Sequence, residues 1–371
     1  MKRPNWPGLG VFLVPYLIVL AAAPLPAADV APGATPAPRT GPTDSEERSA
    51  ATASLGHPGA GHNRFDLQRT DIAAFIEHMA AAGLGRKEVA ALLAKAEPQP
   101  KIIEAMSRPA EKSLQWWEYR AHFLSAERID AGARLWREHR ELLDAIAMEH
   151  HVDPEYLLGI VGVETYFGRI TGHYRVLDAL STLSFDYPPR AEFFRQELEQ
   201  FLLLAHGGEL DALGALGSYA GAMGVAQFMP SSYRRYAVNE GASTRRDLWN
   251  DWGDILGSVA NYLQEHGWSY GQPVLAEARL GKAPEPTSPS TVTLNETLGA
   301  LRQSGLQVDS ALPDDTACLT LPAPLQNGMS YRVGFHNFYV ITRYNRSPLY
   351  AMAVHDLAQA IRARTLDPDA P

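Results

Sequence analysis

The chain contains a single cysteine, Cys318, and therefore cannot form an internal disulfide. Small exported domains often depend on such bridges. Here stability must come from a hydrophobic core, and a body of roughly 300 residues is large enough to bury one. No cysteine lies near the end of the N-terminal apolar segment, which argues against a lipid anchor. We interpret Cys318 as a small core residue rather than a reactive thiol.

Long apolar runs are equally scarce. The clearest one, Val11–Ala23, follows Lys2 and Arg3 and precedes small residues. A short basic region, an apolar stretch and small residues are typical of a secretory signal peptide, and the run is short for a membrane span. We therefore expect residues 1–28 to be a cleaved signal peptide; an uncleaved signal anchor is the alternative.

Basic residues are outnumbered, with 33 Lys and Arg against 42 Asp and Glu, which gives a formal net charge of −9. An acidic protein is a poor ligand for nucleic acids and anionic membranes. We expect no nucleic-acid partner. If the substrate is also anionic, short-range contacts in a groove must capture it.

Large apolar residues are almost missing from residues 29–64, which are rich in Ala, Pro, Thr, Gly and Ser. This composition predicts a disordered linker. The folded body should span residues 65–364. We divide it into a helical lobe (65–150), a core (151–270) and a final part (271–364) with a loop, small strands and a closing helix.

Apolar periodicity predicts helices through most of the body. Their ranges are Asp71–Ala82, Arg86–Ala96, Pro100–Met106, Ala126–His150, Leu177–Leu183, Arg190–His206, Leu256–His266, Leu294–Gly305 and Leu349–Ala363. The segment Ser113–Phe123 is notable for its aromatic residues Trp116, Trp117, Tyr119 and Phe123. The Glu149-His150-His151 end is interpreted as solvated rather than metal-binding. Residues 270–300 otherwise suggest a loop. Strands are predicted at Cys318–Leu321, Tyr331–Phe335 and Asn337–Tyr344, the last with a loop as alternative.

Residues 152–168 are the most informative stretch. Asp153 suits the N-cap and Pro154 the first position of a helix that is apolar on nearly every face and therefore buried. Glu164 is placed within it, and burial should raise the pKa of its carboxyl. A carboxyl that stays protonated can give its proton to a leaving group. The alternative is a buried Glu satisfied by an Arg or a backbone amide.

Residues Gly214–Pro230 are too rich in glycine for an ordinary core element. Glycines let the backbone approach a ligand or another segment closely. We interpret the stretch as a cleft wall that presents Ser218, Met223 and Gln227. It is neither a P-loop nor a nucleophile elbow, because the defining residues of both motifs are missing.

Three ordered motifs give this chain a family resemblance. They are Gly159-Ile-Val-Gly-Val-Glu-Thr-x-x-Gly168, Leu177-Asp-Ala-Leu-Ser-Thr-Leu-Ser-Phe and Gly217-Ser-Tyr-Ala-Gly-Ala-Met-Gly-Val-Ala-Gln-Phe-Met-Pro-Ser-Ser-Tyr233. Two more, Gly257-Ser-Val-Ala-Asn-Tyr-Leu and Asn337-Phe-Tyr-Val-Ile-Thr-Arg-Tyr-Asn345, extend it. Together they closely resemble the membrane-bound lytic murein transglycosylase B family, glycoside hydrolase family 103. The apparent absence of a lipidation cysteine suggests a soluble, periplasmic member.

The resemblance implies an α+β, mostly α, lysozyme-like fold and cleavage of the β-1,4 bond between N-acetylmuramic acid and N-acetylglucosamine in peptidoglycan. It also implies 1,6-anhydro-muramic acid ends. Glu164 matches the family's single catalytic acid, acting with help from the substrate's acetamido group. The substrate-binding positions that match are Ser218, Met223, Gln227, Tyr119, Tyr262, Asn337 and Tyr344. Core packing is the alternative for the three tyrosines.

Only one carboxylate occupies such a motif, whereas ordinary glycosidases pair two about 5–9.5 Å apart. Asp178 and Asp186 are candidate second acids, but local hydrogen bonding explains them better. The competing functions are a lysozyme-type hydrolase of the same bond and a non-catalytic peptidoglycan-binding scaffold.

Many family members carry an EF-hand-like loop where this chain has residues 239–254. The alternating acidic ligands are missing, and Arg245 and Arg246 occupy the middle. Because Ca²⁺ needs about 6–8 oxygens, several of them anionic, we predict no calcium here. We expect no cofactor and a monomer whose partners are glycan strands and, in addition, other cell-wall enzymes.

Overall fold

The computed structural model describes residues 64–107, 114–241, 244–282, 285–286 and 291–367. The predicted signal peptide and all but the last residue of the predicted linker lie outside these ranges. Within them, no helix combines the length and apolar character that a bilayer span requires.

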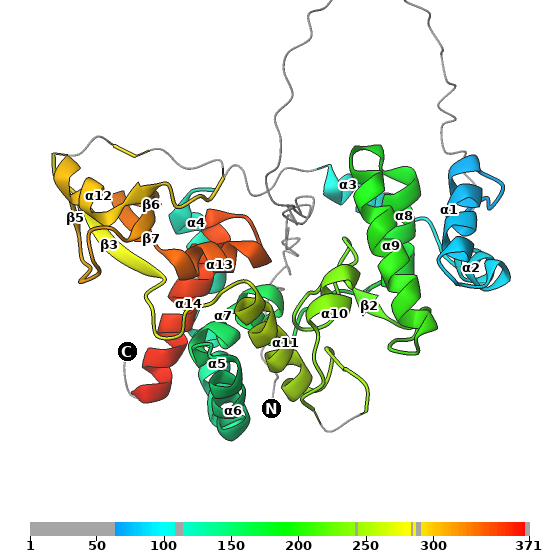
Figure 1. Ribbon diagram of the computed structural model, residues 1–371, viewed down its shortest axis with the longest axis horizontal. Coiled ribbons are helices and arrows are strands. Elements are labelled where there is room, and N and C mark those ends of the chain that lie inside the picture. The colour runs from blue at the N-terminus through cyan, green and yellow to red at the C-terminus, as the bar shows by residue number, and fades with distance from the viewer. Residues whose placement is uncertain (1–63, 108–113, 242–243, 283–284, 287–290, 368–371) are drawn as a thin grey trace, which may run out of the picture.

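Helices make up most of the described chain (Figure 1). In order they are α1 (Thr70–Ala81), α2 (Arg86–Leu93), α3 (Pro100–Met106), α4 (Trp116–Phe123), α5 (Ala126–Glu138), α6 (Arg140–His150), α7 (Pro154–Thr165), α8 (Val176–Asp186), α9 (Ala191–His206), α10 (Pro230–Tyr236), α11 (Trp252–Glu265), α12 (Leu298–Ser304), α13 (His336–Tyr344) and α14 (Pro348–Leu366). A short 3₁₀ helix, η2 (Pro188–Arg190), separates α8 from α9.

The strands form antiparallel sheets. A two-stranded ribbon pairs β1 (Tyr174–Arg175) with β2 (Leu216–Gly217). A five-stranded sheet has the order β4-β6-β7-β3-β5. Its strands are β3 (Leu275–Leu280), β4 (Glu296–Thr297), β5 (Leu306–Val308), β6 (Ala317–Leu325) and β7 (Gly328–Gly334). The predicted class, mostly α with a small β part, is confirmed. Figure 1 places the larger sheet at one end of the molecule and α1 and α2 at the other.

Helix α7 runs through the centre of the protein. Every residue from Glu155 to Thr165 is buried, as the apolar pattern predicts. It packs against α14 at Gly159, where a Cβ atom would lie only 2.8 Å from the carbonyl oxygen of Val354. Glycine therefore lets two helix backbones approach closely here. Asp153 occupies the N-cap position and Pro154 the first helical position, as predicted, but the Asp153 side chain makes no capping hydrogen bond. It accepts hydrogen bonds from the Trp268 indole and the Gly271 amide instead.

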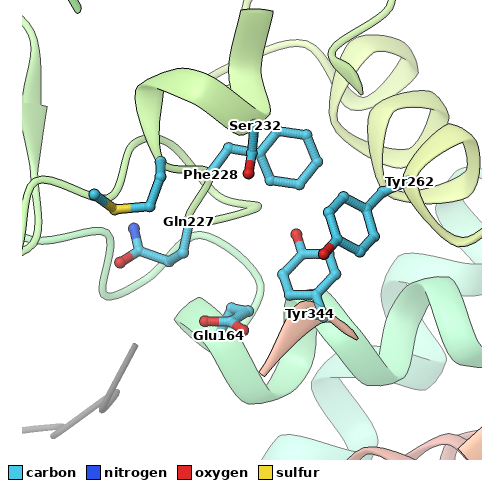
Figure 2. A pocket seen from close by; sticks show the side chains of 7 residues that line it. Glu164, Gln227, Phe228, Ser232, Tyr262 and Tyr344 are labelled. Carbon is cyan, nitrogen blue, oxygen red and sulfur yellow. The ribbon is translucent and has the colours of Figure 1, made fainter. Parts of the chain in front are cut away.

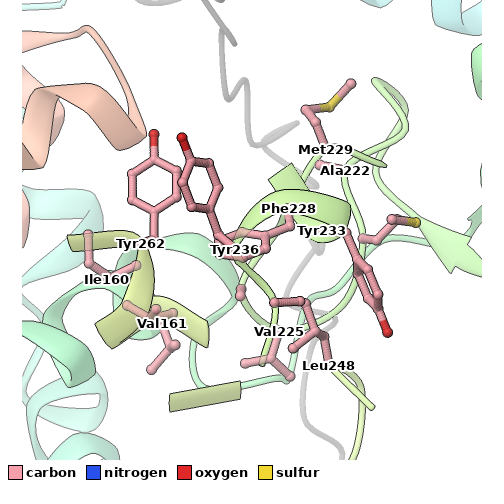
Figure 3. Close-up of a cluster of buried hydrophobic side chains, with 14 of the residues drawn as sticks. Ile160, Val161, Ala222, Val225, Phe228, Met229, Tyr233, Tyr236, Leu248 and Tyr262 are labelled. Carbon is pink, nitrogen blue, oxygen red and sulfur yellow. The ribbon is translucent and has the colours of Figure 1, made fainter. Parts of the chain in front are cut away.

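A continuous apolar cluster joins α7 to the elements that follow it. Figure 3 shows Ile160 and Val161 of α7 in the same region as Val225, Phe228 and Leu248 of the loops, together with tyrosines of α10 and α11. All of these side chains are buried. Burial of a large apolar side chain contributes roughly 1.5–3 kcal/mol, so this cluster holds the glycine-rich loop firmly against α7.

Three local predictions were wrong. The predicted helix 126–150 is divided at His139, whose backbone (φ −117°, ψ 28°) is not helical. Residues 275–280 form strand β3 rather than a loop. Residues Asn337–Tyr344 form helix α13 rather than a strand or loop. Other predicted elements agree with the structure to within a few residues at their ends, and Cys318 is a buried core residue as expected.

His150, at the end of α6, is buried rather than solvated. Its ring nitrogens lie 2.6 Å from Glu240 Oε1 and 2.8 Å from Gln264 Oε1. The hydrogen bond with Glu240 is the main reason that the pKa of His150 is raised above its ordinary value of 6.5. A raised folded-state pKa means that the pair stabilises the protein fully below about pH 6.5, and that this contribution is lost as pH rises through the folded-state pKa.

Glu240→Gln should therefore lower stability more at pH 6 than at pH 9. We expect a loss of about 1–3 kcal/mol at pH 6, because the variant leaves a buried imidazolium without its anion. Urea unfolding at both pH values measures the difference. Glu141→Gln, which changes an exposed residue of α6, the helix that ends with His150, is the control. An equal loss at both pH values would contradict proton linkage.

Candidate active site

A pocket lies beside the central apolar cluster, which supplies Phe228, Met229 and Tyr262 to its lining. It is lined by residues of α7, α10, α11 and α13 and of the glycine-rich loop, namely Glu164, Gln227, Phe228, Met229, Ser232, Tyr262 and Tyr344. Figure 2 shows Phe228 and Ser232 across the pocket from Glu164. The lining combines aromatic rings, a carboxyl, an amide and a hydroxyl, which is the composition expected of a binding site for a polar organic ligand.

Glu164 lies near the C-terminal end of α7 and is only 5% exposed. The hydroxyl of Tyr350, on α14, donates a 2.7 Å hydrogen bond to its Oε1. Burial raises the pKa of the Tyr350 hydroxyl well above its ordinary value, and the charge of Glu164 adds to the rise. Tyr350 therefore keeps its proton and remains a hydrogen-bond donor to the carboxyl group.

An aromatic wall stands beside Glu164. The rings of Tyr262 and Tyr344 meet edge to face with centroids 4.8 Å apart, and Phe228 lies 5.8 and 5.7 Å from them. The Tyr262 hydroxyl donates to the carbonyl of Arg343, and the Tyr344 hydroxyl to that of Ala226, both at 2.6 Å. These bonds fix the rings, so the wall is rigid before any ligand arrives.

Gln227 adopts a left-handed backbone conformation, with φ 52°. Its side-chain amide nitrogen donates to the carbonyls of Thr171 (3.1 Å) and Gly224 (2.8 Å). With both amide hydrogens engaged, the side-chain oxygen is the atom that can accept a bond from a ligand. A left-handed non-glycine residue costs free energy, and such positions concentrate at functional sites.

The chain turns sharply directly after Glu164. Tyr166, Phe167 and Gly168 have consecutive positive φ angles of 53°, 57° and 81°. The Thr165 hydroxyl holds this turn, because it accepts from the Gly168 amide and donates to the Val225 carbonyl at 2.9 Å. The motif Glu-Thr-x-x-Gly thus ends the helix one residue after the acid and ties it to the glycine-rich loop.

The structure brings four of the predicted site residues together in the pocket: Glu164, Gln227, Tyr262 and Tyr344. The other four lie outside its lining. Met223 is fully buried and pairs with Gly217 and Phe228 in isolated bridges. Ser218 lies in a tight turn, where its hydroxyl oxygen accepts from the Ala222 amide at 3.1 Å.

Tyr119 and Asn337 are also absent from the lining. Tyr119 is buried on α4 beside Phe123, with ring centroids 5.1 Å apart. Asn337 is fully buried, and its side chain bonds the backbone of Ser269 and Gln272. These contacts hold the segment after α11, which is a structural use of the amide.

Sequence reasoning missed four residues of the site. Phe228, Met229 and Ser232 belong to the long glycine-rich motif, so their position beside Gln227 was the available signal. Tyr350 had no such signal: it lies 186 residues from Glu164 in the closing helix, and only the packing of α14 on α7 brings them together.

No cluster of three or more His, Cys, Asp or Glu side chains suited to a metal ion occurs in the described part of the chain. In the segment 239–254, of which residues 242–243 are not described, the carboxylate of Asp254 accepts the amides of Glu240, Gly241 and Asp247 at 2.7–2.8 Å. The absence of calcium stays a prediction.

Comparisons with known proteins show which family the chain belongs to. Residues 67–359 match the transglycosylase SLT domain family. The membrane-bound lytic murein transglycosylase B of Escherichia coli (strain K12) is 38% identical over 288 residues, which cover 75% of this chain and 79% of that protein.

Solved structures are similar as well. The soluble lytic transglycosylase SltB1 of Pseudomonas aeruginosa superposes with a TM-score of 0.75 at 46% identity, covering 79% of this chain and 98% of that one. SltB3 of Pseudomonas aeruginosa, in complex with NAG-anhNAM-pentapeptide, gives a TM-score of 0.69 at 31% identity and covers 78% of both chains. The fold is accordingly lysozyme-like, and the chain belongs to the transglycosylase SLT domain family of lytic murein transglycosylases, enzymes that cleave peptidoglycan.

Proposed function

We propose that this enzyme cleaves the β-1,4 bond between N-acetylmuramic acid and N-acetylglucosamine and leaves 1,6-anhydro-muramic acid ends, with Glu164 as its single acid and base. One observation carries the proposal: among the described residues, Glu164 is the one carboxyl that lines the pocket, and it is almost fully buried. Burial favours the protonated form that a general acid needs.

Three other acids, Asp178, Asp186 and Asp254, already have structural partners. Asp178 accepts from the Glu97 amide and from Arg175, and Asp186 is paired with Arg69. Asp254 binds three backbone amides of its own loop. None of these three lines the pocket. A mechanism with two carboxylates would need a second acid within about 5–9.5 Å of the first, so this arrangement favours a single-acid route.

In that route the substrate supplies the nucleophile. Glu164 gives its proton to the glycosidic oxygen as the C1–O bond breaks, and the carbonyl oxygen of the muramic acid's own 2-acetamido group bonds C1. The ionised Glu164 then takes the C6 hydroxyl proton, and O6 displaces the acetamido oxygen from C1. Atoms and charge balance, because Glu164 regains its proton and no water is added.

The remaining site residues would bind and orient the sugars. The Tyr262–Tyr344 wall offers flat apolar surface for the faces of the rings. The Gln227 oxygen can accept from a sugar hydroxyl or acetamido N–H. Ser218 keeps a hydroxyl hydrogen with which to orient the acetamido carbonyl. We retain Met223, Tyr119 and Asn337 only as supports of the cleft, because their side chains lie in the core.

Tyr350 should tune the acid. Its hydroxyl donates to Glu164 Oε1, and a bond of this kind favours the ionised carboxylate over the protonated acid. Tyr350→Phe should therefore move the alkaline limb of the pH–rate profile, along which the acid loses its proton, to higher pH. Rates of muropeptide release measured across pH check this. An unchanged alkaline limb would rule out the tuning role.

Product analysis tests the reaction class. Purified sacculi digested with the enzyme should yield muropeptides one water lighter than the hydrolysis products, as expected for anhydro ends. Products that carry the added water would indicate a lysozyme-type hydrolase, and binding without release would indicate a scaffold.

Because peptidoglycan lies outside the inner membrane, we also propose that the protein is exported to the periplasm. Detection of the mature N-terminus near residue 29 in a periplasmic fraction tests this proposal.

A further inference from the structure

Helix α10 forms one wall of the pocket, yet it is only seven residues long. A helix this short is not stable by itself, so its position depends on contacts from other elements. Phe228 and Met229 precede its first residues and Ser232 belongs to its first turn, and all three line the pocket. Whatever holds the start of α10 therefore holds this wall.

The start of α10 is held by Glu197, which belongs to α9 and is 4% exposed. One carboxylate oxygen accepts from the Ser231 amide at 2.9 Å, and the other accepts from the Ser231 hydroxyl at 2.7 Å. The first amides of a helix have no partner within it, and a negative charge complements the positive end of its dipole. Glu197 meets both needs from outside the helix.

The opposite end of α10 is held by a cation. Arg246 donates to the carbonyls of Tyr233 (3.3 Å) and Ala237 (3.0 Å), and its guanidinium pairs with Glu209. None of these residues lines the pocket. Glu197 and Arg246 thus hold opposite ends of α10. Only Glu197 binds a residue, Ser231, that lies next to the lining residue Ser232.

Burial of a carboxylate carries a cost. Burial raises the pKa of Glu197, while its bonds to Ser231 and the nearby Arg190 oppose the rise. A buried charge is weak evidence for stability. The burial of Glu197 is better explained by its position, because it holds the start of α10 through Ser231.

We propose that Glu197 is a positioning residue for glycan binding: through Ser231 it fixes the wall made by Phe228, Met229 and Ser232 and so sets the affinity of the pocket for saccharide. The inference rests on the proposed function, because it takes peptidoglycan glycan as the ligand. Glu197 touches no reacting group, so its effect should appear in binding rather than in the chemical step.

The test uses the Glu164→Gln protein as parent, so that ligand is bound but not consumed. Calorimetry with a (GlcNAc–MurNAc)₂ tetrasaccharide gives the Kd. Adding Glu197→Gln should raise the Kd about tenfold, the effect typical of losing a hydrogen bond to a charged group. Ser231→Ala should raise it less, because the amide bond survives. The double variant should match Glu197→Gln, since both changes remove the same contact.

Two controls separate positioning from general damage. Glu199→Gln alters a carboxylate of the same helix that pairs with His78 on α1, and it should leave the Kd unchanged. Arg246→Gln should lower the unfolding midpoint without an equal loss of affinity. In the active enzyme, Glu197→Gln should raise KM about tenfold and leave kcat within about twofold.

The inference is overturned if Glu197→Gln and Ser231→Ala bind as tightly as the parent, or if Arg246→Gln weakens binding as much as they do. If Glu197→Gln fails to fold, the Kd of the Ser231→Ala variant alone decides whether the positioning role holds. A parent that binds no saccharide would overturn the proposed function as well. A parent that binds, with variants that bind equally, overturns the positioning role alone.

Discussion

Glu164→Gln should reduce muropeptide release by about 10²–10⁴-fold, the usual contribution of general acid catalysis. Glutamine keeps the shape of the side chain, and its oxygen can still accept the hydrogen bond from Tyr350. It has no proton to give to the glycosidic oxygen and cannot take one from the C6 hydroxyl. Both proton transfers of the proposed cycle are lost, while the pocket keeps its form. The measurement is the initial rate of soluble product release from sacculi.

Glu155→Gln is the matched control, because Glu155 is a similarly buried acid of the same helix. Its side chain accepts a hydrogen bond from Arg362 of α14 and does not line the pocket. The variant should lower the unfolding midpoint and keep most of the activity at a temperature where it is folded. If both glutamine variants lost activity equally, the loss would report damage to α7, and the assignment of Glu164 as the acid would fail.

The sequence predicted helix α7 and the burial of Glu164 well because the signal was local. An apolar segment of helical period with one carboxyl can be buried in only a few ways, and α7 is buried along its length. The pairing of Gln227 with aromatic residues was predicted from the family motif rather than from the residues alone. Periodicity could not reveal that Tyr262 and Tyr344 meet at 4.8 Å.

The errors occurred where tertiary packing opposes local preference. Asn337–Tyr344 is rich in aromatic and β-branched residues, which favour strands. The segment is a helix because Phe338, Ile341 and Thr342, three and four positions apart, are buried on one face. Strand β3 was missed for a different reason, since its local pattern does predict a strand. Its alternating burial follows the Leu-Ala-Glu-Ala-Arg-Leu pattern, a signal that the surrounding Pro, Gly and Ser obscured.

Individual site residues were harder to predict than elements. Tyr350 reaches Glu164 from a helix that appears in the sequence only as a closing amphipathic segment. Asn337 belongs to a motif of the family, yet its amide is fully used by the backbone of residues 269–272. A motif therefore locates a site to within a few residues, whereas the direction of each side chain depends on long-range packing.

Asp254→Asn should destabilise the protein by about 2–4 kcal/mol, the largest loss of stability that we expect from a change of so few atoms. Asp254 is fully buried at the start of α11. Its two oxygens accept three backbone amides of the preceding loop, at 2.7–2.8 Å. In the variant one oxygen becomes a donor, so at least one amide loses its acceptor and faces another N–H group.

Urea unfolding measures the loss, which should appear as a lower midpoint at an unchanged slope. Asp247→Asn is the control from the same loop, because Asp247 is only half-buried; its loss should stay below about 1 kcal/mol. A loss this small for Asp254→Asn would mean that the loop does not depend on its carboxylate.

The loop also connects to the active site, so the variant should report on activity. The Leu248 carbonyl accepts from the Val225 amide at 2.7 Å, and the Trp249 indole donates to the Leu216 carbonyl at 3.0 Å. Both contacts support the glycine-rich loop that carries Gln227. We therefore expect Asp254→Asn to keep near-normal activity in the cold and to lose it on warming before global unfolding. Activity lost only together with the fold would show that the loop and the pocket wall are not separately stable units.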